Sequence, residues 1–450
     1  MKFDGFLLRK LHAFTAARMR MVAVACYLAG GLLGVQGAKA DDGLKSAFLL
    51  GYRDHPDLQD ARAKLEAAIA QVALDHAGTR PTVHLNAAAG LLRDSTAVVS
   101  TPGAASVNAG FDYRPRKYGV EVSLPVYQGG ALRASIRQSE ALLAVQSAQV
   151  RDTEQKVFLG IAVACSDIQK AMRDLESARR YESQLSQALQ GVAGLVARQD
   201  ATRTDQGRGE SRLANARIQL SQSQIALEAA RASYKAWTGE PPPELASCES
   251  TAALPASAQE ALAQAMVDHP NLEAVRRGIN ATRTGVDTAT AGWLPAMNLA
   301  TGVRRAREAQ AWEISDTTRY LTLNASLSLY AGGATASRVR QAEQVLRQRE
   351  LDLQESQSAL QAAVAEAWYG LLATQDTLAA RVSQVAAVQR SLQGMTRQRE
   401  QRSFFELLDA HRELYNAEVS LHVAQREATL GRWLLLARTG GLTAARLGLQ

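Results

Sequence analysis

The chain has 450 residues, of which 11 are proline and 5% are aromatic. This composition favours long helices over the compact core of an α/β enzyme. The formal net charge of +7 falls to +2 without residues 1–40, which hold six Lys or Arg and one Asp, so nucleic-acid binding loses its main compositional support.

Residues 1–40 are predicted to be a secretory signal peptide. Basic side chains precede an apolar run at residues 21–34, which is shorter than a membrane span, and Ala38-Lys39-Ala40 fits a small-x-small cleavage site. The alternative is an uncleaved membrane anchor. We expect export from the cytoplasm.

Residues 41–239 are expected to form the first copy of a tandem repeat. The copy begins with an Ala-rich helical stretch that ends before Pro81, and two alternating runs follow. A very long helix without proline and a shorter helix complete it. The predicted ranges are 44–77 for the first helix, 82–91 and 118–126 for the strands, and 130–198 and 209–237 for the last two helices.

A connector at residues 240–256, which contains three consecutive prolines, separates the two copies. Cys248 lies in this connector and Cys165 lies within the first long helix. An oxidising periplasm would allow them to pair. Because they belong to such different elements, we expect Cys165 to be a buried thiol and Cys248 to be unpaired.

Residues 257–440 are expected to form the second copy, and residues 441–450 a C-terminal tail. His55-Pro56-Asp57-Leu58 recurs as His269-Pro270-Asn271-Leu272, and Tyr127-Gln128-Gly129-Gly130 recurs as Tyr330-Ala331-Gly332-Gly333. The predicted ranges are 257–291 for the first helix, 296–303 and 320–329 for the strands, and 333–399 and 403–438 for the long and shorter helices.

The four predicted strands alternate apolar with polar or small residues, and each is about as long as a membrane strand. Four strands cannot close a barrel, and hydrocarbon does not tolerate open sheet edges, so several copies of the chain would have to share one barrel. Ordinary soluble hairpins are the alternative. The predicted lipid-facing residues are Val83, Leu85, Val120, Val122, Leu299, Leu321 and Leu323.

Each long helix would extend roughly 100 Å, which no globular core buries, so coiled-coil or bundle packing is expected. A helical tube joined to a membrane barrel would be a conduit across the periplasm and outer membrane. A soluble periplasmic coiled-coil scaffold is the rival class. No catalytic triad, phosphate loop or metal-ligand spacing is found, so we expect no enzyme activity, no cofactor and no metal.

The ordered set of signal peptide, duplicated His-Pro helix starts, Pro81 and Pro295 before the strands, and Tyr-x-Gly-Gly turns resembles the TolC family of outer-membrane factors. The most specific match is Phe405-Glu406-Leu407-Leu408-Asp409-Ala410 followed by Leu414-Tyr415-Asn416-Ala417. The resemblance implies a mainly α chain with a membrane β-barrel. Three copies would form one 12-stranded barrel continuous with a coiled-coil periplasmic tunnel, and the connector and tail would form an equatorial belt.

The resemblance also implies where the periplasmic entrance lies. Glu406 and Asp409 match the family's acidic ring, and Arg402 matches the Arg of a latch that closes the tip. The expected partners of Arg402 are Glu210 and Ser211, because Arg212 stands where the family usually has Asp.

By resemblance, the chain would be the outer-membrane duct of a tripartite export system. Its partners would be a periplasmic adaptor (membrane fusion) protein, an inner-membrane ABC transporter or proton-driven pump, the exported cargo, outer-membrane lipid and two further copies of itself. The sequence looks most similar to the type I secretion branch that exports calcium-binding-repeat toxins. Multidrug or small-molecule efflux is the main alternative.

Overall fold

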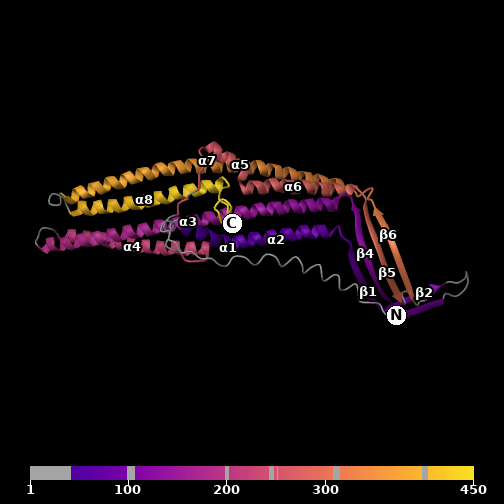
Figure 1. Cartoon of the computed structure of the whole chain (residues 1–450). Coiled ribbons are helices and arrows are strands. Elements are labelled where there is room, and N and C mark those ends of the chain that lie inside the picture. Colours follow the sequence, from indigo (N-terminus) through magenta and orange to yellow (C-terminus); the bar gives the residue numbers. More distant parts are fainter. Residues whose placement is uncertain are drawn as a thin grey trace, which may run out of the picture. The chain divides into compact units, whose positions relative to one another are not determined.

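The computed structural model describes residues 42–98, 107–197, 202–242, 248–250, 252–307, 315–397 and 404–449 (Figure 1). The predicted signal peptide and Arg402 lie outside these residues.

Each predicted opening helix is two helices in the structure. α1 (Asp42–Asp54) and α2 (Pro56–Ala77) form the first pair, and α5 (Ala258–Asp268) and α6 (Pro270–Thr290) form the second. Proline lacks an N–H and favours the first helical turn, so each prolyl residue ends one helix and begins the next. The Nδ1 atom of His55 caps α2 by accepting a hydrogen bond from the Asp57 N–H at 3.2 Å, whereas His269 makes no side-chain cap.

The long helices are α3 (Ala131–Ala197) and α7 (Ala334–Arg397), of 67 and 64 residues. They are followed by α4 (Arg203–Thr238) and α8 (Phe404–Arg438). α4 begins six residues before its predicted start, because Thr202 and Asp205 form a capping box there. In Figure 1, α3 runs beside α4 and α7 beside α8; α3 also contacts α2, α6 and α8. The long helices therefore pack side by side instead of around a globular core, and much of the surface of α4 and α7 stays exposed in the single chain.

Four antiparallel strands form the main sheet in the order β1-β4-β5-β6. Their bounds are Thr82–Ala89, Arg116–Gln128, Ala296–Arg307 and Asp316–Ser326. The short 3-10 helix η1 (Ala291–Trp293) lies between α6 and β5. The last strand begins four residues before its predicted start and ends three residues before its predicted end. A second sheet pairs β2 (Leu92–Val98) with β3 (Val107–Tyr113), and neither strand was predicted, because their polar and small residues do not alternate clearly.

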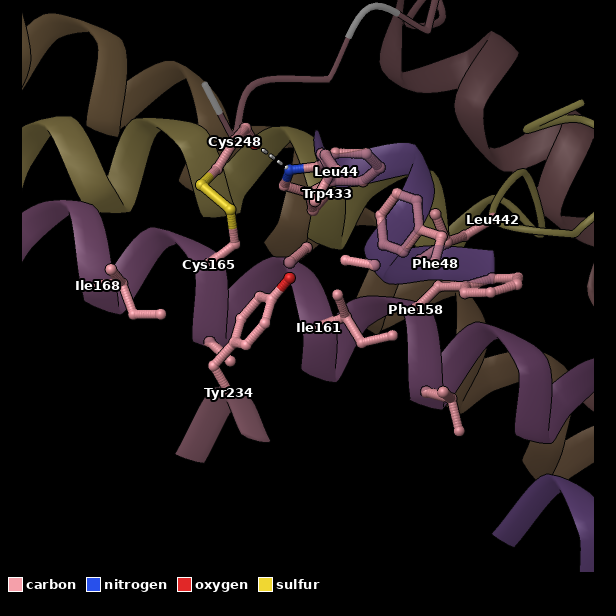
Figure 2. Packing of buried hydrophobic residues seen from close by; sticks show 14 of the residues in the cluster. Leu44, Phe48, Phe158, Ile161, Cys165, Ile168, Tyr234, Cys248, Trp433 and Leu442 are labelled. Carbon is pink, nitrogen blue, oxygen red and sulfur yellow. Dashed lines mark hydrogen bonds between the residues drawn. A yellow bond between two sulfur atoms is a disulfide. The ribbon is translucent and has the colours of Figure 1, made fainter. Parts of the chain in front are cut away.

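The largest apolar cluster lies around the middle of α3, where α1, α2, α4, α8, the connector and the C-terminal tail meet. Figure 2 shows Phe48, Phe158, Trp433 and Leu442 packed beside Ile161 and Tyr234. The Phe158 and Phe48 rings pack edge-on with their centres 5.3 Å apart, and the centres of the Phe48 and Trp433 rings are 5.5 Å apart. This cluster fastens the connector and the tail to the helices.

The prediction for the cysteines was wrong, because Cys165 and Cys248 form a disulfide (Figure 2). Their Cα atoms lie 5.9 Å apart, within the range that a disulfide requires. The connector folds back onto α3, and the Trp433 indole N–H donates to the Cys248 carbonyl at 2.9 Å. Because the two cysteines lie in different elements, the sequence alone did not show that the fold brings their thiols together.

Candidate functional site

The first candidate site is the end of the helices where α3 leads to α4 and α7 leads to α8. A small apolar cluster holds α3, α4 and α8 together there, with Leu408 2% exposed at its centre. The Tyr181 and Tyr415 rings stack at 4.9 Å, and burial raises the pKa of both phenols. We call this region, at residues 181–189, 202–216 and 404–415, the tip.

The two predicted acidic residues differ in their surroundings. Glu406 is exposed, whereas Asp409 is half-buried and forms an ion pair with Arg212 of α4 at 3.1 Å. Arg412 approaches the same carboxylate at 3.4 Å. Arg212 also lies 5.4 Å from the centre of the Phe405 ring, within the range of a cation–π contact. The Arg that departs from the family pattern therefore links α4 to α8 within one chain.

The predicted latch residues are only partly described. Glu210 accepts a hydrogen bond from Gln206 Nε2 at 2.9 Å, one turn earlier on α4, and Ser211 is exposed beside it. Arg402, their expected partner, lies outside the described residues. The link through Arg212 was not predicted, although its replacement of the usual Asp was a signal in the sequence.

A series of polar contacts joins α3 to α8 between the tip and the middle. Asp174 accepts from Lys170 Nζ at 2.6 Å and lies 2.8 Å from His422 Nδ1, and Asp167 pairs with Arg426. Burial disfavours the ionised Asp174 carboxylate, but the hydrogen bonds from His422 and Lys170 outweigh burial and lower its pKa. Asp167 and Asp174 are seven residues apart, so they lie on one face of α3. The sequence shows this spacing, but it does not show that Arg426 and His422 are their partners.

The second candidate site is the four-stranded sheet, whose register fixes its two faces. Residues directly opposite each other in an antiparallel pair lie on the same face. Val83 is opposite Val122, Leu85 is opposite Val120, and Leu299 is opposite both Leu124 and Leu323. All seven predicted lipid-facing residues thus share one face, and Val83, Leu85, Val120, Leu321 and Leu323 are exposed in the isolated chain.

The other face of the sheet is polar and connected by hydrogen bonds. The Tyr320 hydroxyl donates to Glu121 at 2.6 Å, and Asn298 Nδ2 donates to Ser123 Oγ at 2.9 Å. Tyr320 on β6 reaches Glu121 on β4 by crossing Gly302 on β5, where a Cβ atom would lie 2.8 Å from the Tyr320 Oη. Gly302 is therefore the residue that leaves room for this contact.

Within the described ranges, no helix is both long and apolar enough to cross a membrane. The same residues hold no group of three or more His, Cys, Asp or Glu side chains that could hold a metal ion.

The outer membrane efflux protein family matches residues 53–240 and 261–439. The outer membrane efflux protein BepC of Brucella suis is 25% identical over 437 residues, which cover 96% of this chain and 92% of BepC. Protein CyaE of Bordetella pertussis is 26% identical over 346 residues, covering 74% of this chain and 70% of CyaE. The outer membrane channel CmeC of Campylobacter jejuni superposes with a TM-score of 0.77 at 13% identity, covering 94% of this chain and 91% of CmeC.

The matching family and the solved structures are outer-membrane channel proteins, not enzymes. BepC and CmeC each match this chain over most of its length. The matched residues take in both long helices, all four strands of the main sheet and the tip. The chain belongs to the outer membrane efflux protein family, as a TolC-family channel component of the outer membrane that extends into the periplasm.

Proposed function

We propose that three copies of the chain form one export channel, with a shared 12-stranded barrel and a coiled-coil tunnel below it. The observation that carries this proposal is a four-stranded sheet with an exposed apolar face and two open edges. Among the described strands, β1 pairs with β4 alone and β6 pairs with β5 alone. In hydrocarbon every backbone N–H and C=O group needs a partner, so β1 and β6 must meet strands of other copies. Each chain would contribute its two structural repeats to the channel, and the two matched segments of the chain support that duplication.

The proposed barrel places the apolar face toward lipid and the hydrogen-bonded polar face toward the lumen. Val120→Arg, at mid-sheet on the apolar face, should destabilise the assembly by about 2–4 kcal/mol. Ser123→Arg, three residues further along β4 and on the polar face, should have a much milder effect, measured as the melting temperature of the detergent-solubilised protein. Equal effects of the two variants would contradict the assigned faces.

In the proposed trimer, Glu406 and Asp409 of three chains form an acidic ring at the periplasmic entrance. Six carboxylates around one axis would attract cations and select what enters. Arg402, with Glu210 or Ser211, would latch the closed state, and the pair between Arg212 and Asp409 supports a second link at the same level. The connector and tail, fastened at Cys248 and Leu442, would form the belt around the tunnel.

For the cargo, we propose a protein toxin of the calcium-binding-repeat class, delivered by type I secretion. The resemblance of the sequence to the type I secretion branch supports this proposal. Small-molecule efflux is the second candidate, supported by the similarity to BepC over 96% of the chain. In both cases the channel would act with a periplasmic adaptor protein and an inner-membrane ABC transporter or proton-driven pump.

The architecture and the cargo need separate tests. The channel should be extracted from membranes by detergent and should give a three-chain species on crosslinking. A stable monomer in detergent would contradict the trimer, and complete recovery in aqueous extracts would favour the soluble coiled-coil scaffold. Deletion of the gene should abolish appearance of the toxin in the medium if secretion is the function, whereas increased sensitivity to drugs and dyes with normal secretion would favour efflux.

A further inference from the structure

The apolar face of the sheet ends in a group of arginines. We call the end of the sheet at Arg116 the distal end, because the other end of β4, at Gln128, leads into α3. On the apolar face, β4 carries Arg116, β5 carries Arg305 and Arg307, and β6 carries Arg319. All four side chains are exposed. These four residues are the arginine band.

The register brings like charges together on this face. Arg116 is directly opposite Arg307, and Arg305 is diagonal to Arg319 because it lies opposite Thr317. Like charges directly across an antiparallel pair destabilise a sheet. No acidic residue of β1, β4, β5 or β6 lies on the apolar face, and none of the ion pairs among the described residues involves the band. The repulsion therefore calls for an anion from outside these strands.

The polar face at the same level is different, because its charges are balanced. Lys117 and Arg304 lie there with Glu121 and Asp316, so two cations are matched by two acids. The excess positive charge at the distal end is therefore confined to the apolar face of the main sheet and is absent from its polar face.

The position of the band matches the depth of lipid headgroups. From Leu124 to Arg116 the apolar face of β4 runs eight residues, or about 26 Å along the strand, which at a 40° tilt is about 20 Å of membrane thickness. Tyr118, an aromatic residue of the kind that lies at membrane interfaces, separates the band from Val120. At the other end, Trp293 and Tyr330 are exposed beside the strands and would mark the opposite interface.

We propose that the arginine band binds the phosphate groups of outer-leaflet lipid. Guanidinium groups bind phosphate through paired hydrogen bonds, and neighbouring arginines can share one diphosphorylated headgroup. Three of the four arginines lie on β4 and β5, the two central strands, so that contacts between copies at the sheet edges leave them open to lipid. The proposal rests on the membrane barrel proposed above.

The test compares two double variants that remove the same charge from opposite faces. Full-length wild type, Arg305→Gln with Arg307→Gln, and Lys117→Gln with Arg304→Gln are reconstituted in phosphatidylcholine bilayers containing diphosphoryl lipid A or its dephosphorylated form. Lipid retained by the released protein is measured by native mass spectrometry, which reports the number of chains in the same spectrum.

Wild type should retain the diphosphoryl lipid at least ten times better than the dephosphorylated lipid, and this preference should fall about tenfold in the apolar-face variant. In the polar-face variant, the preference for the diphosphoryl lipid should stay within about twofold of the wild-type value. Equal loss in both variants, or no preference in wild type, would overturn the proposal. Displacement of the lipid by inorganic phosphate at comparable concentration would also overturn it, in favour of a free-phosphate site. Loss of the three-chain species in wild type with the lipid preference retained would instead contradict the trimer.

Discussion

The middle of the helices and the tip are held together by different forces. Around the middle, one apolar cluster gathers α1, α2, α3, α4, α8, the connector and the tail, and a disulfide crosslinks two of them. At the tip, a smaller cluster joins α3, α4 and α8, beside a half-exposed pair between Arg212 and Asp409. The difference indicates that the middle is held rigidly, whereas the tip can rearrange at a lower cost in free energy.

The largest expected effect comes from emptying the middle cluster. Phe158→Ala should lower the free energy of unfolding by about 3–5 kcal/mol, because Phe158 of α3 is fully buried and packs against Phe48 of α1. Phe158→Leu, which leaves a smaller cavity, should cost clearly less. Thermal or denaturant unfolding in detergent measures both, and equal losses would mean that packing at this position does not hold the middle together.

Removal of the disulfide should have the next largest effect. Replacing Cys165 and Cys248 together by Ala should cost about 2–4 kcal/mol, because the bond closes a loop across a sequence separation of 83 residues in the unfolded chain. Because both cysteines are fully buried, a reductant should act slowly on the folded protein. Rapid reduction of the native protein would contradict the fixed middle.

Local opening should be easier at the tip than in the middle. Amide hydrogens of α4 and α8 at residues 206–216 and 406–415 should exchange at least tenfold faster than those of α3 at residues 157–168, because fewer elements cover them. Hydrogen exchange with mass spectrometry measures both regions in one sample. Equal protection would remove the distinction between the two regions.

Loss of the Arg212 pair should affect cation binding more than stability. Arg212→Gln should change the free energy of unfolding by less than about 1 kcal/mol, since both partners are partly exposed. The released Asp409 carboxylate should then bind a trivalent cation more tightly. Arg217→Gln, also on α4, removes a similar surface pair with Glu182 of α3; it is the control and should leave cation binding unchanged.

The smallest effect is a pH dependence in the middle. Burial raises the pKa of Glu154 above its ordinary value of 4.5, although the Ala444 backbone and nearby arginines oppose the shift. The folded state therefore binds this proton more tightly, and its favourable contribution below pH 4.5 is lost as pH rises through the folded pKa. Glu154→Gln should be slightly more stable than wild type at pH 7, with the advantage disappearing below pH 4.5. An advantage that persists in acid would contradict this explanation.

The sequence predicts the elements better than the contacts between them. Proline positions and apolar alternation predicted the long helices and the four main strands to within a few residues, because these signals are local. The larger differences are the early start of α4, the longer β5 and the earlier start of β6. The pairing of Cys165 with Cys248, and that of Asp174 with His422, could not be predicted, since each joins residues far apart in the chain. At the tip, the assignment of Glu406 and Asp409 to the entrance stays a prediction of the motif. The pairing of Arg212 with Asp409 could not be predicted, because it depends on which face of α4 meets α8.

The most direct test of the proposed channel is current through the protein in a planar bilayer, with and without a trivalent cation such as hexamminecobalt. Wild type should conduct and be blocked from the periplasmic side, because six carboxylates would converge at the entrance. Glu406→Ala combined with Asp409→Ala should conduct, remain a trimer and lose the block. A block that survives removal of both carboxylates, or a wild-type protein that forms no channel, would contradict the entrance proposed at the tip.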